Sequence, residues 1–137
     1  MKNSVLTVVA VLSAPLLYGL ICVPLVALLA GAFPELVNEA GGTHDVMLTL
    51  QIESVQLIAL VLIGAVVAAI APSHRMRHVG IAVAVMMVIG VMVQLSAWDA
   101  MLVWHHFVFF ACILLGLPAG AIVYGKLRPE AEVDSGA

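Results

Sequence analysis

Several polar side chains lie inside apolar stretches of this sequence, and the carboxyl and imidazole groups among them are the ones that could do chemistry. Glu53 lies about seven residues inside an apolar run, which corresponds to about 10 Å along a helix. If the run spans a membrane, an ionisable group at that depth is costly and is a candidate functional residue. The polar cluster expected at this depth comprises Glu53, Gln56, Gln94, His105, His106 and His44.

This polar cluster admits four kinds of chemistry. The preferred interpretation is that its members hydrogen-bond one another and fix the register of the helices. Alternatively, Glu53 with His105 or His106 could carry protons or ions, because histidine titrates near neutral pH. His44 with His105 or His106 could hold a haem axially. The fourth is a metal site from Glu53, His105 and His106, although adjacent helical residues point about 100° apart and do not readily share one ion.

The composition indicates which elements must position these side chains. The chain has 137 residues, of which 64% are hydrophobic and 9% charged, whereas soluble domains average about 25% charged residues. A hydrocarbon core of about 30 Å requires about 20 apolar residues per helix, and four runs are long enough. We therefore expect an all-α bundle of four transmembrane helices with antiparallel neighbours, at about residues 5–33, 46–71, 79–97 and 100–124. These helices form one membrane domain, residues 1–126, followed by a disordered cytoplasmic tail at 127–137.

The basic residues predict the orientation of these helices. All five Lys and Arg residues lie at the amino terminus, between the second and third runs, or near the carboxyl terminus. By the positive-inside rule, both termini are cytoplasmic, and the chain is a multi-pass protein of the cell (inner) membrane. The first run is longer than the core of a signal peptide, so we expect it to be retained. Pro15 and Pro24 should each bend it, because a proline removes a helical hydrogen bond.

Small residues four positions apart predict close helix packing. In lipid, helices associate largely through close backbone approach. Cys22 and Cys112 are interpreted as small apolar side chains. His74 and His78 lie among arginines and are interpreted as solvated residues that face lipid head groups. We expect three small-residue pairs to pack inside the bundle rather than to form a homodimer face: Gly64 and Ala68, Gly80 and Ala84, and Gly116 and Gly120.

The last third of the chain resembles a known group of proteins. The segment Trp98-Asp99-Ala100-Met101 is followed by Trp104-His105-His106-Phe107, and then by Pro118 and Gly120. This series resembles the carboxyl-terminal part of small four-helix bacterial integral membrane proteins that have no assigned activity. Leu102 stands where a proline often follows the methionine in that group. The resemblance implies four helices and a bacterial membrane, and it implies no reaction.

The sequence also limits the classes of function. It contains no glycine-rich nucleotide motif, no HExxH or CxxC and no GxSxG, and the net charge of −3 argues against nucleic acid as a partner. We expect a small structural or accessory membrane protein without a cofactor, rather than an enzyme. Its partners would be the lipid bilayer and either further copies of the chain or a larger membrane complex. The alternatives are a proton- or ion-coupled carrier or channel that uses Glu53 with His105 or His106, and a haem- or quinone-binding redox subunit.

Overall fold

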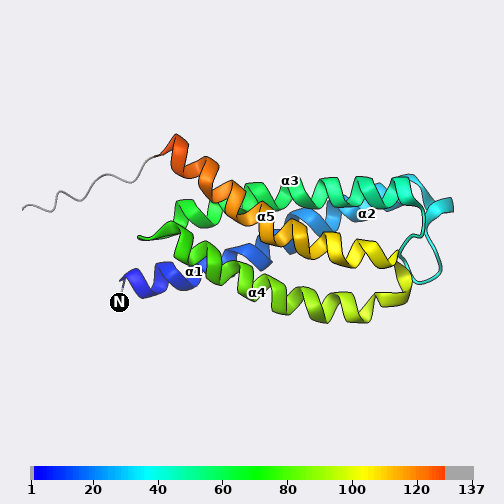
Figure 1. Ribbon diagram of the computed structural model, residues 1–137, viewed down its shortest axis with the longest axis horizontal. Coiled ribbons are helices and arrows are strands. Elements are labelled where there is room, and N and C mark those ends of the chain that lie inside the picture. The colour runs from blue at the N-terminus through cyan, green and yellow to red at the C-terminus, as the bar shows by residue number, and fades with distance from the viewer. Residues whose placement is uncertain (1, 129–137) are drawn as a thin grey trace, which may run out of the picture.

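The computed structural model describes residues 2–128, which form four helical spans (Figure 1). The first span consists of α1 (Lys2–Leu17), the π-helical turn η1 (Tyr18–Cys22) and α2 (Val23–Ala32). The others are α3 (Val46–Ile70), α4 (Arg75–Ser96) and α5 (Val103–Leu127), and the 3-10 turns η2 (Pro34–Leu36) and η3 (Trp98–Ala100) lie in the connections. Each span is long and apolar enough to cross a membrane, which confirms the predicted all-α bundle of four membrane helices.

The helix ends differ from the expected ones by a few residues. α4 begins at Arg75 instead of residue 79, because His74 closes the preceding turn in the left-handed conformation with φ 45°. α5 begins at Val103 instead of residue 100, because η3 ends at Ala100 and the next two residues, Met101 and Leu102, are extended. It continues to Leu127, so the expected disordered tail starts inside a helix. Residues 129–137 of that tail lie outside the described residues.

The two prolines of the first span stand on either side of a change in helix type. The N–H of Val23 donates to the carbonyl of Tyr18, which is the fifth residue before it, as in a π-helix. A proline ring clashes with the carbonyl four residues before it, and the wider π turn ahead of Pro24 gives that carbonyl room. The disturbance expected from Pro15 and Pro24 therefore takes the form of η1, which carries Tyr18 and the buried Cys22.

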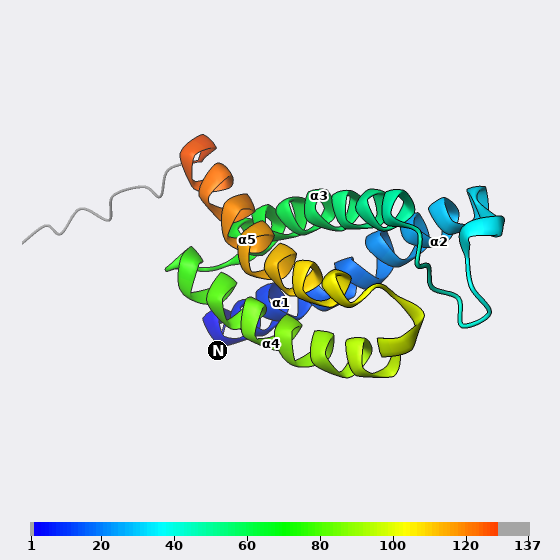
Figure 2. The same ribbon diagram turned by 45° about the vertical axis from the view of Figure 1, so that its right-hand side comes forward.

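Close backbone contact joins α3 to α5, the pair of helices with the most extensive contact (Figure 2). Consecutive spans are antiparallel, so these two helices run in the same direction. A Cβ atom on Gly64 would overlap the backbone of Leu117, and one on Gly120 would overlap the carbonyl of Val61. One on Gly116 would come within 2.8 Å of the Leu60 side chain. Glycine is therefore required for this approach, as predicted for these positions.

The prediction for the third small-residue pair is wrong. Gly80 and Ala84 are exposed on the outer face of α4. A Cβ atom added to Gly80 would meet nothing within 4 Å, so this glycine does not allow any close approach within the bundle. Small residues are common in this chain, and their spacing alone does not distinguish an inner face from an outer one.

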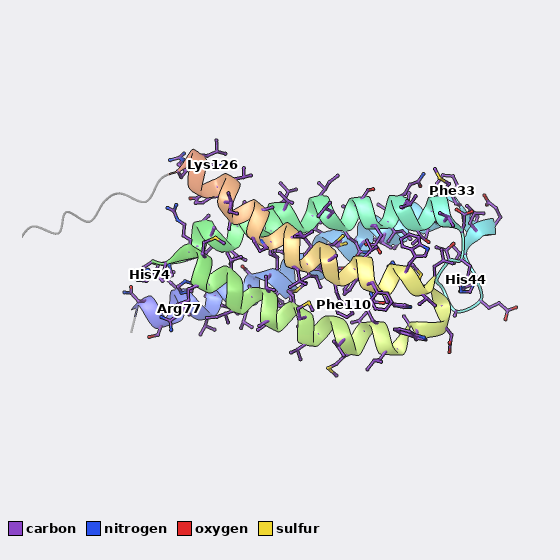
Figure 3. All side chains as sticks on the ribbon, viewed as in Figure 1. Phe33, His44, His74, Arg77, Phe110 and Lys126 are labelled. Atoms are coloured by element: carbon purple, nitrogen blue, oxygen red, sulfur yellow. The ribbon has the colours of Figure 1, made fainter. Side chains whose placement is uncertain are left out.

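The two ends of the bundle differ in charge, and we call them the basic end and the acidic end. Figure 3 shows His74, Arg77 and Lys126 at the basic end, where the described chain begins and ends. Phe33 and His44 lie at the opposite, acidic end. The acidic end is formed by η3 and by the loop after α2, and these segments carry Glu35, Glu39, Asp45 and Asp99.

The interpretation of His78 as a solvated residue is wrong. This side chain is only 7% exposed, and its Nε2 atom lies 3.0 Å from the Oγ1 atom of Thr7 on α1. Its Nδ1 atom lies 3.3 Å from the carbonyl oxygen of His74. Because α1 packs against α4, it covers this histidine, whereas His74 remains exposed as expected.

A fully buried apolar layer separates the polar residues of the two ends. Its members come from α3, α4 and α5 and are 0% exposed. This layer lies on the basic-end side of Gln56 on α3, between His78 and the polar cluster. It comprises Leu60, Ile63, Val67, Val79, Ile113 and Leu117.

Candidate functional site: a polar cavity near the acidic end

A buried carboxylate–imidazole pair connects α3 to α5. Glu53 and His105 are each 5% exposed, and the Oε1 atom of Glu53 is in ion-pair contact with the Nδ1 atom of His105. Neither atom has another partner among the described residues. The thiol of Cys112, about two turns further along α5, donates to the second oxygen of Glu53 over 3.6 Å. Both oxygens of this carboxylate therefore face α5.

The adjacent residue His106 belongs to a second pair. It is 1% exposed, and its Nδ1 atom lies 2.6 Å from the Oε1 atom of Gln94 on α4. Its Nε2 atom lies 3.2 Å from the carbonyl oxygen of Trp98, and its ring stacks on the Trp98 ring at 4.3 Å between centroids. Successive residues on a helix point about 100° apart, so His105 faces α3 while His106 faces α4.

The two histidine pairs are neighbours in one cluster. The ring centroids of His105 and His106 lie 5.4 Å apart. The structure thus brings Glu53, Gln94 and both histidines together, but each histidine has its own partner. Among residues 2–128, no group of three His, Cys, Asp or Glu side chains has a metal-binding arrangement. The other histidine of the expected cluster, His44, is exposed in the loop before α3 and lies outside both pairs.

Tyr18 extends the cluster toward the first span, and the sequence analysis did not include it. Its hydroxyl donates to the Oε1 atom of Gln56 over 2.6 Å. Gln56 lies on the same face of α3 as Glu53, because residues three apart on a helix are neighbours. The only feature of the sequence that points to Tyr18 is the presence of a tyrosine within an apolar run, close to two prolines. The π turn that brings it to α3 could not be read from that pattern.

A cavity of about 370 Å³ lies beside this cluster. Most of its wall is apolar and includes Val26 of α2, Ile52 of α3 and Phe109 of α5. The residues of the wall that carry hydroxyl, amide, imidazole or thiol groups are Tyr18, Cys22, Thr43, Gln56, Gln94 and His105. Glu53 is not part of the wall and is linked to it through His105, which lines the cavity and contacts the carboxylate.

The cavity reaches the outside of the bundle between α2 and α4. Val23 of α2 and Val93 of α4 both line it, and they are 57% and 51% exposed. α2 has no buried residue; it contacts α3 and has diverged from α4, against which α1 packs. The loop after η2 covers the cavity at the acidic end and is held there by Asn38, whose side-chain N–H donates to the carbonyl of Ala100 over 2.8 Å.

Three nitrogen atoms on the cavity-lining residues have no hydrogen-bond partner in the part of the chain that the structure describes. They are the amide nitrogens of Gln56 and Gln94 and the Nε2 atom of His105. The amide groups of Gln56 and Gln94 can each donate two hydrogen bonds, whereas Nε2 of His105 donates or accepts depending on the tautomer of the ring. The cavity therefore offers two amide donors and one imidazole nitrogen to a bound molecule.

Comparisons of the chain with protein-family models, with curated proteins and with solved structures found no match.

Proposed function

We propose that this multi-pass membrane protein binds a neutral, lipid-soluble molecule whose polar head enters the cavity near the acidic end. The observation that carries the proposal is the set of three unpartnered nitrogen atoms, on Gln56, Gln94 and His105, beside a wall that is mostly apolar. A hydrogen-bond donor that faces an apolar cavity without an acceptor costs free energy. A ligand oxygen that accepts from these groups would remove that cost.

The surroundings of the cavity support a ligand that arrives through the bilayer. The rim contains exposed apolar side chains of α2 and α4, which belong to two spans that are long and apolar enough to cross a membrane. A volume of about 370 Å³ is within the usual range of about 300–1,000 Å³ for small-molecule sites. Such a cavity can hold a ring-sized head while an attached chain passes between α2 and α4 into lipid.

Charge supports a neutral head group. None of the described Lys or Arg residues is at the acidic end, where the nearby loops carry four carboxylates. A phosphate or carboxylate head would have no cation to balance it. A quinone head group has the required properties, since it is flat, uncharged and carries two carbonyl acceptors.

Glu53 has a supporting role in this proposal. Its contact with the Nδ1 atom fixes the orientation of the His105 ring, and the opposite Nε2 atom remains for the ligand. His105 would then touch the bound head group directly, whereas Glu53 acts through His105 as a positioning residue.

The main alternative is a proton- or ion-coupled carrier or channel. Conduction needs a polar path across the bundle, and the layer around Leu60, Ile63 and Leu117 is apolar and fully buried. This layer favours binding at one side of the membrane over conduction through it. We further infer from the positive-inside rule that both termini are cytoplasmic, which would put the cavity in the outer half of the membrane.

A binding measurement with matched variants tests the proposal. The purified protein in lipid nanodiscs would be titrated with a short-chain benzoquinone carrying a decyl tail, and quenching of tryptophan fluorescence would be followed. Gln56→Leu removes one donor from the wall and should weaken binding about tenfold, the usual effect of one hydrogen bond. Gln51→Leu is the control, because Gln51 is exposed on the same helix.

A second pair consists of a variant that fills the cavity without changing its polar groups and a control at the adjacent position. Ala27→Phe puts a large side chain on the α2 wall and should abolish saturable quenching. Leu28→Phe, at an adjacent position that is 71% exposed, should bind as the unaltered protein does. Equal quenching in all four variants would show that the quinone only partitions into the lipid, and would refute the proposal.

A further inference from the structure

Two buried glutamines present only one side of their side-chain amides to the cavity. Gln56 and Gln94 are 3% and 5% exposed, and they line the cavity from α3 and α4 respectively. A glutamine amide carries an acceptor oxygen on one side and a donor NH2 group on the other. The residue that binds one side of the amide therefore determines which side remains for a ligand.

Tyr18 determines the orientation of the Gln56 amide. Its hydroxyl donates to the Oε1 atom over 2.6 Å, and an amide nitrogen could not accept this hydrogen. The tyrosine ring packs edge-on against Phe109 of α5, with 6.4 Å between the ring centroids, and this contact holds it in place. The amide oxygen is thus bound by the first span, and the NH2 group is the side left without a partner among residues 2–128.

His106 determines the orientation of the Gln94 amide in the same way. Its Nδ1 atom lies 2.6 Å from the Oε1 atom of Gln94, and because an amide oxygen can only accept, Nδ1 carries the hydrogen. Stacking on the Trp98 ring and the contact of Nε2 with the Trp98 carbonyl oxygen hold the imidazole in this position. The NH2 group of Gln94 is again the side without a partner in the described chain.

These two contacts give the cavity a donor character. Amides from two helices both present N–H groups, while both amide oxygens are bound elsewhere. The amides alone would not impose this arrangement, since a free glutamine side chain can turn either side toward a ligand. A head group with carbonyl oxygens can accept from both amides, whereas a head group that only donates would face two further donors.

We propose that Tyr18 and His106 are positioning residues that make the cavity select head groups with carbonyl acceptors over head groups that only donate hydrogen bonds. Each of them acts through the glutamine whose oxygen it binds. The inference rests on the binding proposed above for this cavity, and it names the residues that set the specificity of that binding.

Removing only the hydroxyl of Tyr18 tests this role. The protein in lipid nanodiscs would be titrated with decyl benzoquinone, whose carbonyls only accept. The quinone would then be displaced by a pyrrole with a decyl tail, whose N–H only donates. We expect the unaltered protein to bind the quinone more than about tenfold more tightly than the pyrrole, because only the quinone can pair with the amides.

The ratio of the two dissociation constants, pyrrole over quinone, is the quantity to compare between variants. In Tyr18→Phe the ring can still pack against Phe109, but the Gln56 amide is free to turn its oxygen toward the cavity. This ratio should therefore fall about tenfold, the usual effect of one hydrogen bond, here gained by the pyrrole. His106→Phe keeps a ring beside Trp98 and releases the oxygen of Gln94, so it should lower the ratio as well.

Tyr124→Phe is the matched control. Tyr124 is the other tyrosine of the chain, lies near the end of α5 and does not line the cavity, so its variant should keep the ratio of the unaltered protein. A purely structural role of Tyr18 would weaken both probes by the same factor. A ratio that is unchanged in Tyr18→Phe would overturn the inference and leave the proposed binding intact, whereas a lack of saturable quinone binding to the unaltered protein would refute both.

Discussion

Replacing Glu53 by leucine should destabilise the bundle much more than replacing it by glutamine. Leucine leaves the Nδ1 atom of His105 and the thiol of Cys112 facing a hydrocarbon side chain. Breaking a buried ion pair from one side costs about 3–5 kcal/mol, and burying a leucine within the membrane adds no hydrophobic gain, because lipid tails are as apolar as leucine. We therefore expect a loss of about 3–5 kcal/mol.

Glutamine preserves the volume of Glu53 and one acceptor oxygen. It exchanges a charge-assisted contact for a neutral one, at a cost of about 1 kcal/mol. Both variants would be measured by thermal unfolding in detergent, followed by the circular dichroism of the helices. Gln51→Leu is the control on the same helix, and an exposed site of this kind should change stability by about 0.5 kcal/mol at most.

The double variant Glu53→Leu with His105→Leu makes this test decisive. Replacing both members of a buried pair by apolar residues removes the unpaired group, so the double variant should recover most of the stability that Glu53→Leu loses. It should still fail to bind the quinone, because the Nε2 atom is absent. The reasoning is refuted if Glu53→Leu is as stable as Gln51→Leu, or if adding His105→Leu lowers stability further.

Three other predictions concern packing, the loop over the cavity and topology. Gly120→Leu should lower stability by about 3 kcal/mol or prevent folding, because its Cβ atom would overlap a backbone carbonyl of α3; Gly80→Leu should unfold at the temperature of the unaltered protein. Asn38→Ala removes the loop's hydrogen bond to Ala100 and should speed proteolysis of this loop several-fold, as measured by the appearance of two fragments. A reporter fused after Asp134 should be active in the cytoplasm and one inserted near Gly42 outside it, and the reverse pattern would invert the proposed orientation.

The position of the spans could be predicted from the sequence because spanning length and hydropathy are properties of a single segment. The run of apolar residues around α3, for example, is long enough whatever its neighbours are. The same holds for Glu53, whose depth follows from counting residues along α3. That this residue would face the bundle interior, near Gln94 and either His105 or His106, was expected for a similar reason, since a carboxyl group avoids lipid; which histidine it contacts was left open.

Which face of each helix is buried was decided by the tertiary structure alone. A side chain that packs against a neighbouring helix and one that faces lipid are both apolar, so the sequence carries little amphipathic signal. This is why Gly64 and Gly80 have the same kind of spacing but opposite environments, one against α5 and the other exposed. The sequence around His78 likewise carries no sign that α1 covers this residue, and the interpretation of His78 as solvated is therefore wrong.

The cavity likewise depends on the arrangement of the helices. Tyr18 joins the cluster through a π turn, and α2 diverges far enough to leave a space beside Gln56 and His105. His105 contacts α3 and His106 contacts α4 because these two helices lie on different sides of α5. The sequence determined which polar groups enter the membrane, and the packing of the helices determined which of them have partners and which face a cavity.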